Sequence, residues 1–549
     1  MKPDIRRLIY AGASVALFGV AAAWVPSLNA QRVRANLVHT DVADAATPGL
    51  MLGPLLAIGR APLVDYLWMR ASSLKEQGRY FDALQLAETI GRLQPRFGAV
   101  WSFNAWNMSY NISVAMKTAE DRWRWVKNGI DLLRDQGLRH NPRDTRMYKE
   151  LAWIYFHKVG DFMDDKHMYY KLQLALLMED ILGPGANPDF AGMAAAPQSL
   201  DALLTDAAVA RLVERFKTAG ADVSQPGVYL GLLTRLDRPA EQSAILADAT
   251  VADARHRLEM FWRAKRLREE AKLDPARIVR LREVFGPLDF RTADANALYW
   301  SNMGVEIGKG TRVALDIDKL NTDRIELYCL QNLFRHGRLV MSPRARDGEL
   351  PMLLPDVRYA DIMRRAFIAA SKNYERHAGE GPVTSTFESA FINFMREAIM
   401  RFNEAGQIGK SREYFDWLRE HYPESSVKGL TYDQFVAKEW RIARDFVQHK
   451  EVQNRILSVL AEATQLIAYN DLEEAAARIA FARRLYADYH KYQSNRRYDL
   501  EPFPRMFEFV VHELGARMPA EQYRRVLKYT GFSPAATTQP AAATSAPAA

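Results

Sequence analysis

The sequence predicts an all-α protein, in which an N-terminal membrane helix precedes a curved stack of helical hairpins that is interrupted in its middle. Two observations carry this prediction. An uncharged, largely apolar run covers residues 8–31, and small residues, Gly and Pro then recur at helical spacing along most of the chain. The composition is that of a folded protein, since 48% of the 549 residues are hydrophobic and 26% are charged.

The first element is a candidate membrane span. At ~1.5 Å per residue, a helix over residues 8–31 covers the ~30 Å hydrocarbon core of a bilayer, and Trp24 lies near one end, where interfacial aromatic residues belong. Arg6 and Arg7 favour a cytoplasmic N-terminus, so we expect a single-pass protein of the inner (cytoplasmic) membrane with the bulk of the chain outside the cytoplasm. A cleaved signal peptide that ends at Ala30 is the alternative.

The stretch "EQGRYFDALQLAETIGRLQP", from Glu76 to Pro95, has the features of a helical hairpin. Ala71 and Ala83 are small enough for two paired helices to approach closely. Gly78 permits the tight reversal between them, because glycine has no Cβ to restrict its backbone. Pro95 ends the second helix, because it lacks an amide donor and clashes with the preceding turn. The stretch therefore predicts a helix–turn–helix unit.

These offsets resemble those of the tetratricopeptide repeat, a helix–turn–helix unit of about 34 residues. The pattern recurs in segments that begin near Leu67, Trp101, Tyr148, Trp300, Met395 and Val459. The resemblance is best over residues 64–170 and 392–490. The unit at Tyr148 is out of strict register, which we attribute to an insertion around Lys117–Trp123. In the unit at Met395 the turn glycine is Gly406, and in the unit at Val459 Asn470 replaces it.

The repeats and the segments between them divide the chain into regions. These are the anchor or signal peptide (1–32), a juxtamembrane linker (33–63), tetratricopeptide-like repeats (64–182), an irregular helical region (183–290), a tetratricopeptide-like hairpin (291–350), C-terminal repeats (351–532) and a tail (533–549). The tail contains Ala, Pro and Thr but no charge and no large apolar side chain, so we expect it to be disordered.

More loosely, the layout is similar to that of a group of single-anchor bacterial envelope proteins. Two segments carry this resemblance, "QPRFGAVWSFNAWNMSYNISV" (94–114) and "FGPLDFRTADANALYWSNMG" (285–304). It implies a location in the envelope and no particular activity.

Three motifs resemble parts of catalytic or ligand-binding sites. Gly409-Lys410-Ser411 resembles the end of a phosphate-binding loop, but a helical pattern precedes it where that loop needs a strand, and Glu404 would repel phosphate. Ser411 is expected instead to be a helix-packing residue. "DFMDDKH" (161–167) gathers possible cation ligands without the spacing of a known site, so a solvated, helix-capping loop is the expected structure. Cys329 lies in an apolar helical segment and is expected to be a buried thiol. We therefore expect no catalytic residue, metal or cofactor site among these motifs.

The net charge of +8 is not concentrated enough to indicate a nucleic-acid site. In the most basic segment, 254–284, Arg and Lys alternate with Glu and Asp, which is typical of a solvated helix face with ion pairs. Nucleic acid is therefore not the expected partner.

The resemblance to tetratricopeptide repeats implies a binding surface. In that family, the first helix of each repeat lines a concave wall, and its wall positions correspond here to Trp68, Trp106, Arg146, Lys149, Trp153 and Phe156. Indoles flanked by Arg and Lys fit an extended peptide with apolar side chains and an acidic end. The alternative is that these aromatic residues pack against neighbouring helices.

The function predicted from these features is that of a membrane-tethered scaffold or adaptor that binds partner proteins or peptides, without catalysis. Two alternatives remain open. An enzyme could have an unrecognised site in residues 183–350, or the protein could be an envelope spacer that self-associates as a homo-oligomer.

Overall fold

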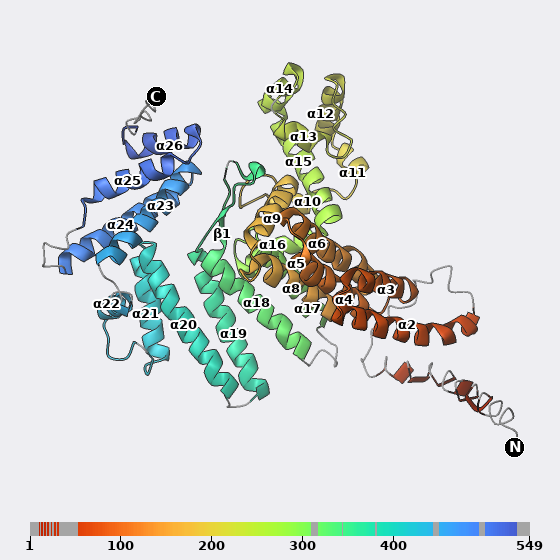
Figure 1. The fold of residues 1–549 in the computed structure, drawn as a ribbon. Helices are drawn as coiled ribbons and strands as arrows, with labels where there is room; N and C mark the ends of the chain where they lie inside the picture. Colours follow the sequence, from red (N-terminus) through yellow and green to blue (C-terminus); the bar gives the residue numbers. More distant parts are fainter. Residues whose placement is uncertain are drawn as a thin grey trace, which may run out of the picture. The chain divides into compact units, whose positions relative to one another are not determined.

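A computed structural model shows that the chain is all-α, as predicted (Figure 1). It describes scattered positions between residues 10 and 34, and residues 53–534 except 236, 309–316, 343, 379–381, 426, 443–448 and 493–499. These residues form helices joined by short turns, with a single two-stranded hairpin among them. They belong to two compact units, Met1–Leu333 (the N-terminal unit) and Phe334–Ala549 (the C-terminal unit).

Ten of the 24 residues of the predicted membrane span (8–31) lie outside the described residues, as do residues 35–52 of the predicted linker and the tail from residue 535. None of the helices in the part of the chain that the structure describes combines the length and the apolar character needed to cross a bilayer.

The N-terminal unit is built from α-helices, four of which continue into the π-helical segments η2, η3, η4 and η6, and it also contains one 3₁₀ turn, η5. Its elements are α2 (Gly53–Glu76), α3 (Tyr80–Leu93), α4 (Gly98–Trp106), η2 (Asn107–Ile112), α5 (Ser113–Ala115), α6 (Ala119–Asp131), η3 (Leu132–Gly137), α7 (Leu138–His140), α8 (Thr145–Trp153), η4 (Ile154–Gly160), α9 (His167–Leu182), α10 (Phe190–Ala195), α11 (Leu200–Leu204), α12 (Ala207–Thr218), α13 (Val228–Thr234), α14 (Ala240–Ala247), η5 (Ala249–Val251), α15 (Ala252–Arg266), η6 (Leu267–Ala271), α16 (Pro275–Phe285), α17 (Ala293–Gly308) and most of α18 (Ile317–His336).

The first hairpin, α2 and α3, has the construction that the sequence predicts. Ala71 and Ala83 are fully buried, so the two helices can approach closely. Gly78 has φ +73° in the turn, a left-handed conformation that favours glycine. α3 ends at Leu93, two residues before Pro95. The roles assigned to these residues are confirmed.

The next hairpin differs from the predicted one. The residues of the insertion expected around Lys117–Trp123 do not form a long connection, because only residues 116–118 separate the two helical segments, Gly98–Ala115 and Ala119–His140. The extra residues instead lengthen both segments, and each contains a π-helical stretch with i→i+5 bonding. Strict 34-residue spacing fails here because the helices are longer than those of a regular repeat.

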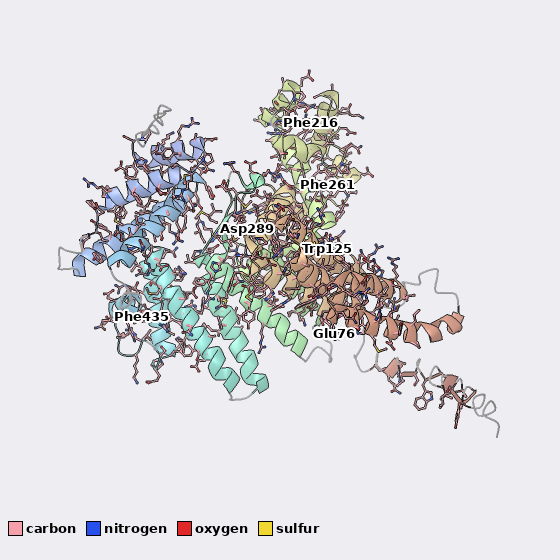
Figure 2. The ribbon with its side chains drawn as sticks, viewed as in Figure 1. Glu76, Trp125, Phe216, Phe261, Asp289 and Phe435 are labelled. Atoms are coloured by element: carbon pink, nitrogen blue, oxygen red, sulfur yellow. The ribbon has the colours of Figure 1, made fainter. Side chains whose placement is uncertain are left out.

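Residues 183–290 form a smaller helical cluster around α15. Phe216 of α12 and Phe261 of α15 are buried in its core (Figure 2), and the indole nitrogen of Trp262 donates to the Val223 carbonyl at 3.1 Å. The basic segment carries the ion pairs that its charge pattern predicts. Arg263 pairs with Glu259 at 2.7 Å and Arg266 with Glu270 at 2.7 Å.

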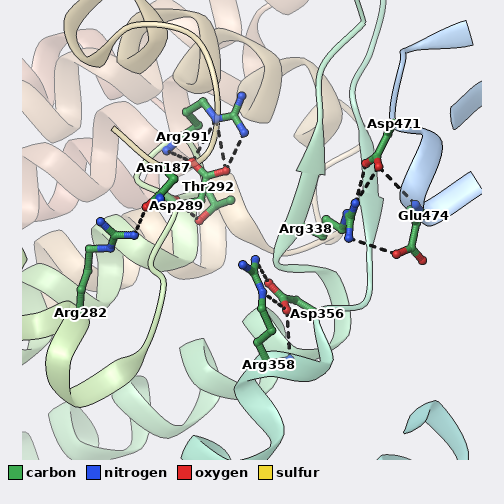
Figure 3. Close-up of polar contacts among 10 residues, drawn as sticks. All are labelled: Asn187, Arg282, Asp289, Arg291, Thr292, Arg338, Asp356, Arg358, Asp471 and Glu474. Carbon is green, nitrogen blue, oxygen red and sulfur yellow. Dashed lines mark hydrogen bonds and ion pairs between the residues drawn. The ribbon is translucent and has the colours of Figure 1, made fainter. Parts of the chain in front are cut away.

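Charged side chains also hold the connections of the N-terminal unit in place. Figure 3 shows Arg291 against Asp289, both buried, with a nitrogen–oxygen distance of 2.8 Å. Arg291 also pairs with Glu179 of α9 at 2.8 Å. The segment before α17 is therefore tied to a helix that lies more than a hundred residues earlier in the sequence.

The C-terminal unit contains the end of α18 and the following elements: β1 (Arg338–Val340), η8 (Ala345–Asp347), β2 (Met352–Leu354), η9 (Val357–Tyr359), α19 (Ala360–Ala378), α20 (Pro382–Glu404), α21 (Ile408–His421), α22 (Tyr432–Ile442), α23 (His449–Ala468), α24 (Leu472–Tyr492), α25 (Phe503–Gly515) and α26 (Ala520–Thr530). β1 and β2 pair antiparallel, with Leu339 opposite Leu353.

Two hairpins of this unit match the sequence analysis. Gly406 turns between α20 and α21 with φ +76°. Asn470, predicted to replace the turn glycine between α23 and α24, has φ +65°, and Asn is one of the few other residues that adopt this conformation readily. Arg338 of β1 joins the strand pair to the second hairpin, because it reaches Asp471 at 2.7 Å and Glu474 at 3.1 Å (Figure 3).

We predict that Gly78→Ala destabilises the N-terminal unit by roughly 1–2 kcal/mol, because the left-handed conformation is costly for a residue with a Cβ. A Cβ at this position would meet no other atom within 4 Å, so backbone strain alone is responsible. The measurement is the midpoint of urea unfolding, followed by circular dichroism.

The matched control is Gly231→Ala in α13, where a Cβ also meets nothing within 4 Å but the residue is helical. This substitution should stabilise the protein by about 0.5–1 kcal/mol. Equal effects of the two substitutions would contradict the assigned role of Gly78.

Candidate functional site

Six rings of the N-terminal unit form a continuous series, which we call the aromatic chain. Its members are Trp106, Tyr110, His157, Trp153, Phe156 and Tyr328. Successive ring centroids lie 4.4, 5.8, 4.9, 5.7 and 6.0 Å apart in that order. The two ends are the most open, since Trp106 is 38% and Tyr328 45% exposed, whereas Phe156 is buried.

Two helical segments with π-turns position most of these rings. Trp106 and Tyr110 are four residues apart along α4 and η2, and Trp153 and His157 are four residues apart along α8 and η4, so each pair stacks along its own helix. The Tyr110 hydroxyl lies 3.3 Å from Nδ1 of His157 and joins the two pairs. Single-turn π-helices are frequent at functional sites, because they shift the side chains that follow them around the helix axis.

Glu150 sets the charge beside the aromatic chain. Its Oε2 accepts a hydrogen bond of 2.6 Å from the indole nitrogen of Trp106, and its Oε1 lies 3.0 Å from the Lys149 ammonium. The cation that the sequence analysis assigned to peptide binding is therefore paired within its own helix. Burial raises the pKa of Tyr110, and the carboxylates of Glu150 and Asp161 add to this effect.

The structure brings together three of the six predicted residues, Trp106, Trp153 and Phe156. Lys149 lies beside them through Glu150, and Arg146 is exposed at the start of α8. Trp68 belongs to a separate cluster, where its ring packs on Phe97 at 5.4 Å and Phe103 at 5.1 Å.

Sequence reasoning missed Tyr110, His157 and Tyr328. Tyr110 and His157 each follow a predicted Trp by four residues, so helical spacing could have found them. Tyr328 comes from α18, and nothing in the sequence near the other rings indicates that it joins them.

A network of ion pairs adjoins the aromatic chain, and its central pair, Lys158 and Asp164, is buried. Lys158 is 4% exposed and pairs with Asp164 at 2.6 Å, and Arg122 lies 3.6 Å from Asp164 and 2.6 Å from Asp165. The Tyr170 hydroxyl donates to Asp164 at 3.3 Å. These contacts occupy the carboxylate, which is itself only 7% exposed.

The "DFMDDKH" segment is therefore only in part the loop expected from the sequence. Asp164 forms a turn just before α9, because its Oδ1 accepts from the amide of Lys166, the residue that precedes the helix, at 2.9 Å; no side chain among the described residues caps the first turn of α9 itself. The expectation that the motif is solvated is wrong for Asp164, which is buried with its cationic partners. No group of three His, Cys, Asp or Glu side chains suited to a metal occurs among the described residues.

Asp294 and Lys171 make a second buried pair of functional groups. Asp294, in the first turn of α17, accepts a hydrogen bond of 3.1 Å from the Asn332 amide, and burial raises its pKa to about 6 although Asn332 and Lys171 oppose this. Burial lowers the pKa of Lys171 to about 8, and the ammonium contacts the Asp161 carbonyl at 3.2 Å and His167 Nδ1 at 2.9 Å. Groups with pKa values of this kind can each gain or lose a proton near neutral pH.

Cys329 is fully buried, as predicted, and burial raises its thiol pKa well above the usual value. The carboxylates of Asp294 and Glu326 act in the same direction. A thiol of this kind is a packing residue, because nucleophilic cysteines are partly exposed and electropositive in their surroundings.

The motif that resembles a phosphate-binding loop is part of a helix in the C-terminal unit. Ser411 lies within α21, is fully buried, and donates to the Ile399 carbonyl at 2.7 Å. Lys410 pairs with Glu413 at 2.9 Å and with Asp361 at 3.4 Å. The interpretation of Ser411 as a helix-packing residue is confirmed.

The fold and these clusters define the class: an all-α protein of packed helical hairpins in which an aromatic chain adjoins a buried charge network. Comparison of the chain with protein families, with characterised proteins and with solved structures finds no match.

We predict that Asp294 makes stability fall as the pH rises. Its pKa of about 6 in the folded protein exceeds the ordinary 3.8, so the folded state keeps a proton that the unfolded state has released between about pH 4 and pH 6. The stabilisation from the protonated form is present below about pH 4 and is lost as the pH rises through 6. The difference between the two pKa values corresponds to at most roughly 3 kcal/mol.

Asp294→Asn removes this titration, so the variant should gain stability over the parent protein on going from pH 4.5 to pH 7.5 in urea unfolding. The control is Asp201→Asn, which neutralises an exposed carboxylate of α11. Parallel pH profiles for the parent and the Asp294 variant would contradict the assignment.

Proposed function

We propose that this protein is a membrane-tethered helical scaffold that binds an extended, apolar segment of a partner protein along the aromatic chain. The observation that carries the proposal is the continuity of the rings from Trp106 to Tyr328, with both ends exposed. Aromatic side chains supply a large contact area with few rotatable bonds, and for that reason they are enriched at the centres of protein interfaces.

The charged residues beside the aromatic chain indicate which side chains the bound segment carries. Because Glu150 neutralises Lys149, that lysine offers no uncompensated charge to an acidic peptide end. The indole N–H of Trp106 is likewise occupied by Glu150. What the aromatic chain presents is ring surface, so the proposed segment carries apolar side chains and needs no acidic end.

The helical hairpins support a scaffold role. Stacked hairpins bury their apolar faces against their neighbours and expose long surfaces that suit binding. The turns at Gly78, Gly406 and Asn470 agree with the tetratricopeptide resemblance of the sequence. We infer that residues 8–31 anchor the chain in the inner membrane and that the scaffold acts outside the cytoplasm.

A photo-crosslinking experiment in intact cells tests the binding surface. Tyr328, 45% exposed, is replaced by a photoreactive phenylalanine analogue, which should form an adduct with the bound protein. Trp106→Ala or Trp153→Ala in the same chain should reduce the adduct by at least tenfold, since truncation of an interface hot spot typically costs about 2 kcal/mol or more.

The control position is Phe81 of α3, which is 51% exposed and lies outside the aromatic chain, so the same analogue there should not form this adduct. Helical content and melting temperature of the Trp variants are measured in parallel. Loss of helical structure together with loss of the adduct would mean that these indoles only pack the fold.

A second candidate function is an enzyme, and the pair of Asp294 and Lys171 favours it, since one pKa is raised and the other lowered. Asp294 lies in the region where the sequence left this alternative open. Both side chains are less than one-tenth exposed, so a substrate could reach them only if the fold opens.

Reductive methylation of lysines distinguishes the scaffold from the enzyme, because it reports whether small molecules reach Lys171. In the native protein Lys171 should stay unmodified while Lys166, 39% exposed, reacts, and both should react in denaturant. Native modification of Lys171 at the rate of Lys166 would show that small molecules reach the pair, and would favour the enzyme.

A further inference from the structure

Two adjacent apolar side chains stand out from the loop between η4 and α9. Phe162 is 77% exposed, more than any other large hydrophobic side chain among the described residues, and Met163 is 68% exposed. We call these two residues the apolar tip. They are part of the "DFMDDKH" segment, whose charged residues serve the buried network while Phe162 and Met163 have no role in it.

The loop that carries the apolar tip is held at both ends. The Phe162 amide donates to Asp161 Oδ1 at 2.7 Å, and Lys171 donates to the Asp161 carbonyl at 3.2 Å. On the other side Asp164 is fixed by Lys158 and by the Lys166 amide. The backbone that carries the two exposed side chains is therefore fixed by these hydrogen bonds and ion pairs. Because the loop is already ordered, binding costs little further conformational entropy.

The charges around the tip are compensated within the protein. Asp164 is paired with Lys158 at 2.6 Å, and Asp165 is paired with Arg122 at 2.6 Å and with Lys166 at 3.1 Å. Asp161 Oδ1 accepts the Phe162 amide. An apolar surface that approaches the tip consequently meets two uncharged side chains, beside carboxylates that are ion-paired at Asp164 and Asp165 and hydrogen-bonded at Asp161.

The area of the apolar tip indicates whether a protein partner or a lipid surface covers it. One large aromatic side chain buries about 150–250 Å², and Met163 adds a comparable amount. A stable protein–protein interface needs roughly 1,200 Å² or more. Two side chains are therefore too few for a protein partner to bind through the tip alone. They are sufficient to orient a chain that is already attached to a membrane, because attachment makes the second contact intramolecular.

We propose that Phe162 and Met163 insert into the interfacial layer of the bilayer to which the chain is tethered, and so fix the orientation of the N-terminal unit at the membrane surface. This proposal rests on the membrane tether of the proposed function, but not on peptide binding by the aromatic chain. The occupant is the lipid surface itself, at the boundary of headgroups and acyl chains.

The test uses the full chain in phosphatidylcholine nanodiscs that contain one copy per disc. Met163→Cys introduces a reactive thiol that an environment-sensitive dye labels selectively, because the native Cys329 is fully buried. We expect dye emission to shift to the blue relative to a polar environment. Quenching should be stronger by a nitroxide near the headgroups than by one at the bilayer centre, since the interfacial layer lies about 5–10 Å deep.

The matched control is Val284→Cys, which labels another exposed apolar position of the same unit, 60% exposed on α16. Its emission should stay that of a polar environment. Adding Phe162→Ser to the Met163→Cys chain should reverse most of the shift, whereas the melting temperature should not change because Phe162 is exposed.

Equal emission at positions 163 and 284 in single-copy discs would overturn the proposal. So would a shift at 163 that appears only in discs with two copies, since the occupant would then be a second copy of the chain. Failure of the tether is a separate result: the protein would not co-purify with the discs at all.

Discussion

The ammonium group of Lys158 connects the parts of the N-terminal unit on which its surfaces depend. It is almost completely buried, pairs with Asp164, and lies over the rings of Tyr110 and Tyr170 at 5.3 and 6.0 Å. A buried ion pair is stable only when its remaining polar atoms are satisfied. Here Arg122, the Lys166 amide and the Tyr170 hydroxyl complete the coordination of Asp164. One charge thus fixes the aromatic chain on one side and the loop of the apolar tip on the other.

The π-helical segment η4 explains how one short stretch contributes both to the aromatic chain and to the charge network. Within η4, five residues are buried, Ile154, Tyr155, Phe156, Lys158 and Val159, which is more of the helix surface than the single apolar stripe of a typical amphipathic helix. The wider turn lets Phe156 meet α18 while Lys158 points to the charge network. A substitution that restored regular α-helical bonding here would separate the rings from the ion pair that supports them.

The charges of this unit are compensated locally, and this determines what its surface can recognise. Glu150 neutralises Lys149 beside the rings, and Arg122 and Lys166 neutralise Asp165 beside the apolar tip. Both surfaces are consequently apolar in character although the chain is rich in charged residues. The exceptions are Asp294 and Lys171, where burial moves both pKa values toward neutrality. That pair makes the region around α17 sensitive to pH.

Local rules were sufficient for the helical hairpins. Gly78, Gly406 and Asn470 were found from the sequence because left-handed turns and small contact residues are local requirements. Ser411 and Cys329 were assigned correctly because an apolar helical context predicts burial. The sequence likewise indicated Trp106, Trp153 and Phe156. Tertiary structure alone decided that Tyr328 joins these rings, that Asp164 is buried, and that Lys149 is neutralised. It also decided that the extra residues of the second hairpin lengthen its helices. The physical reason is that ring stacking and ion pairing depend on which distant segments meet, whereas helical periodicity records only which face of a segment is apolar.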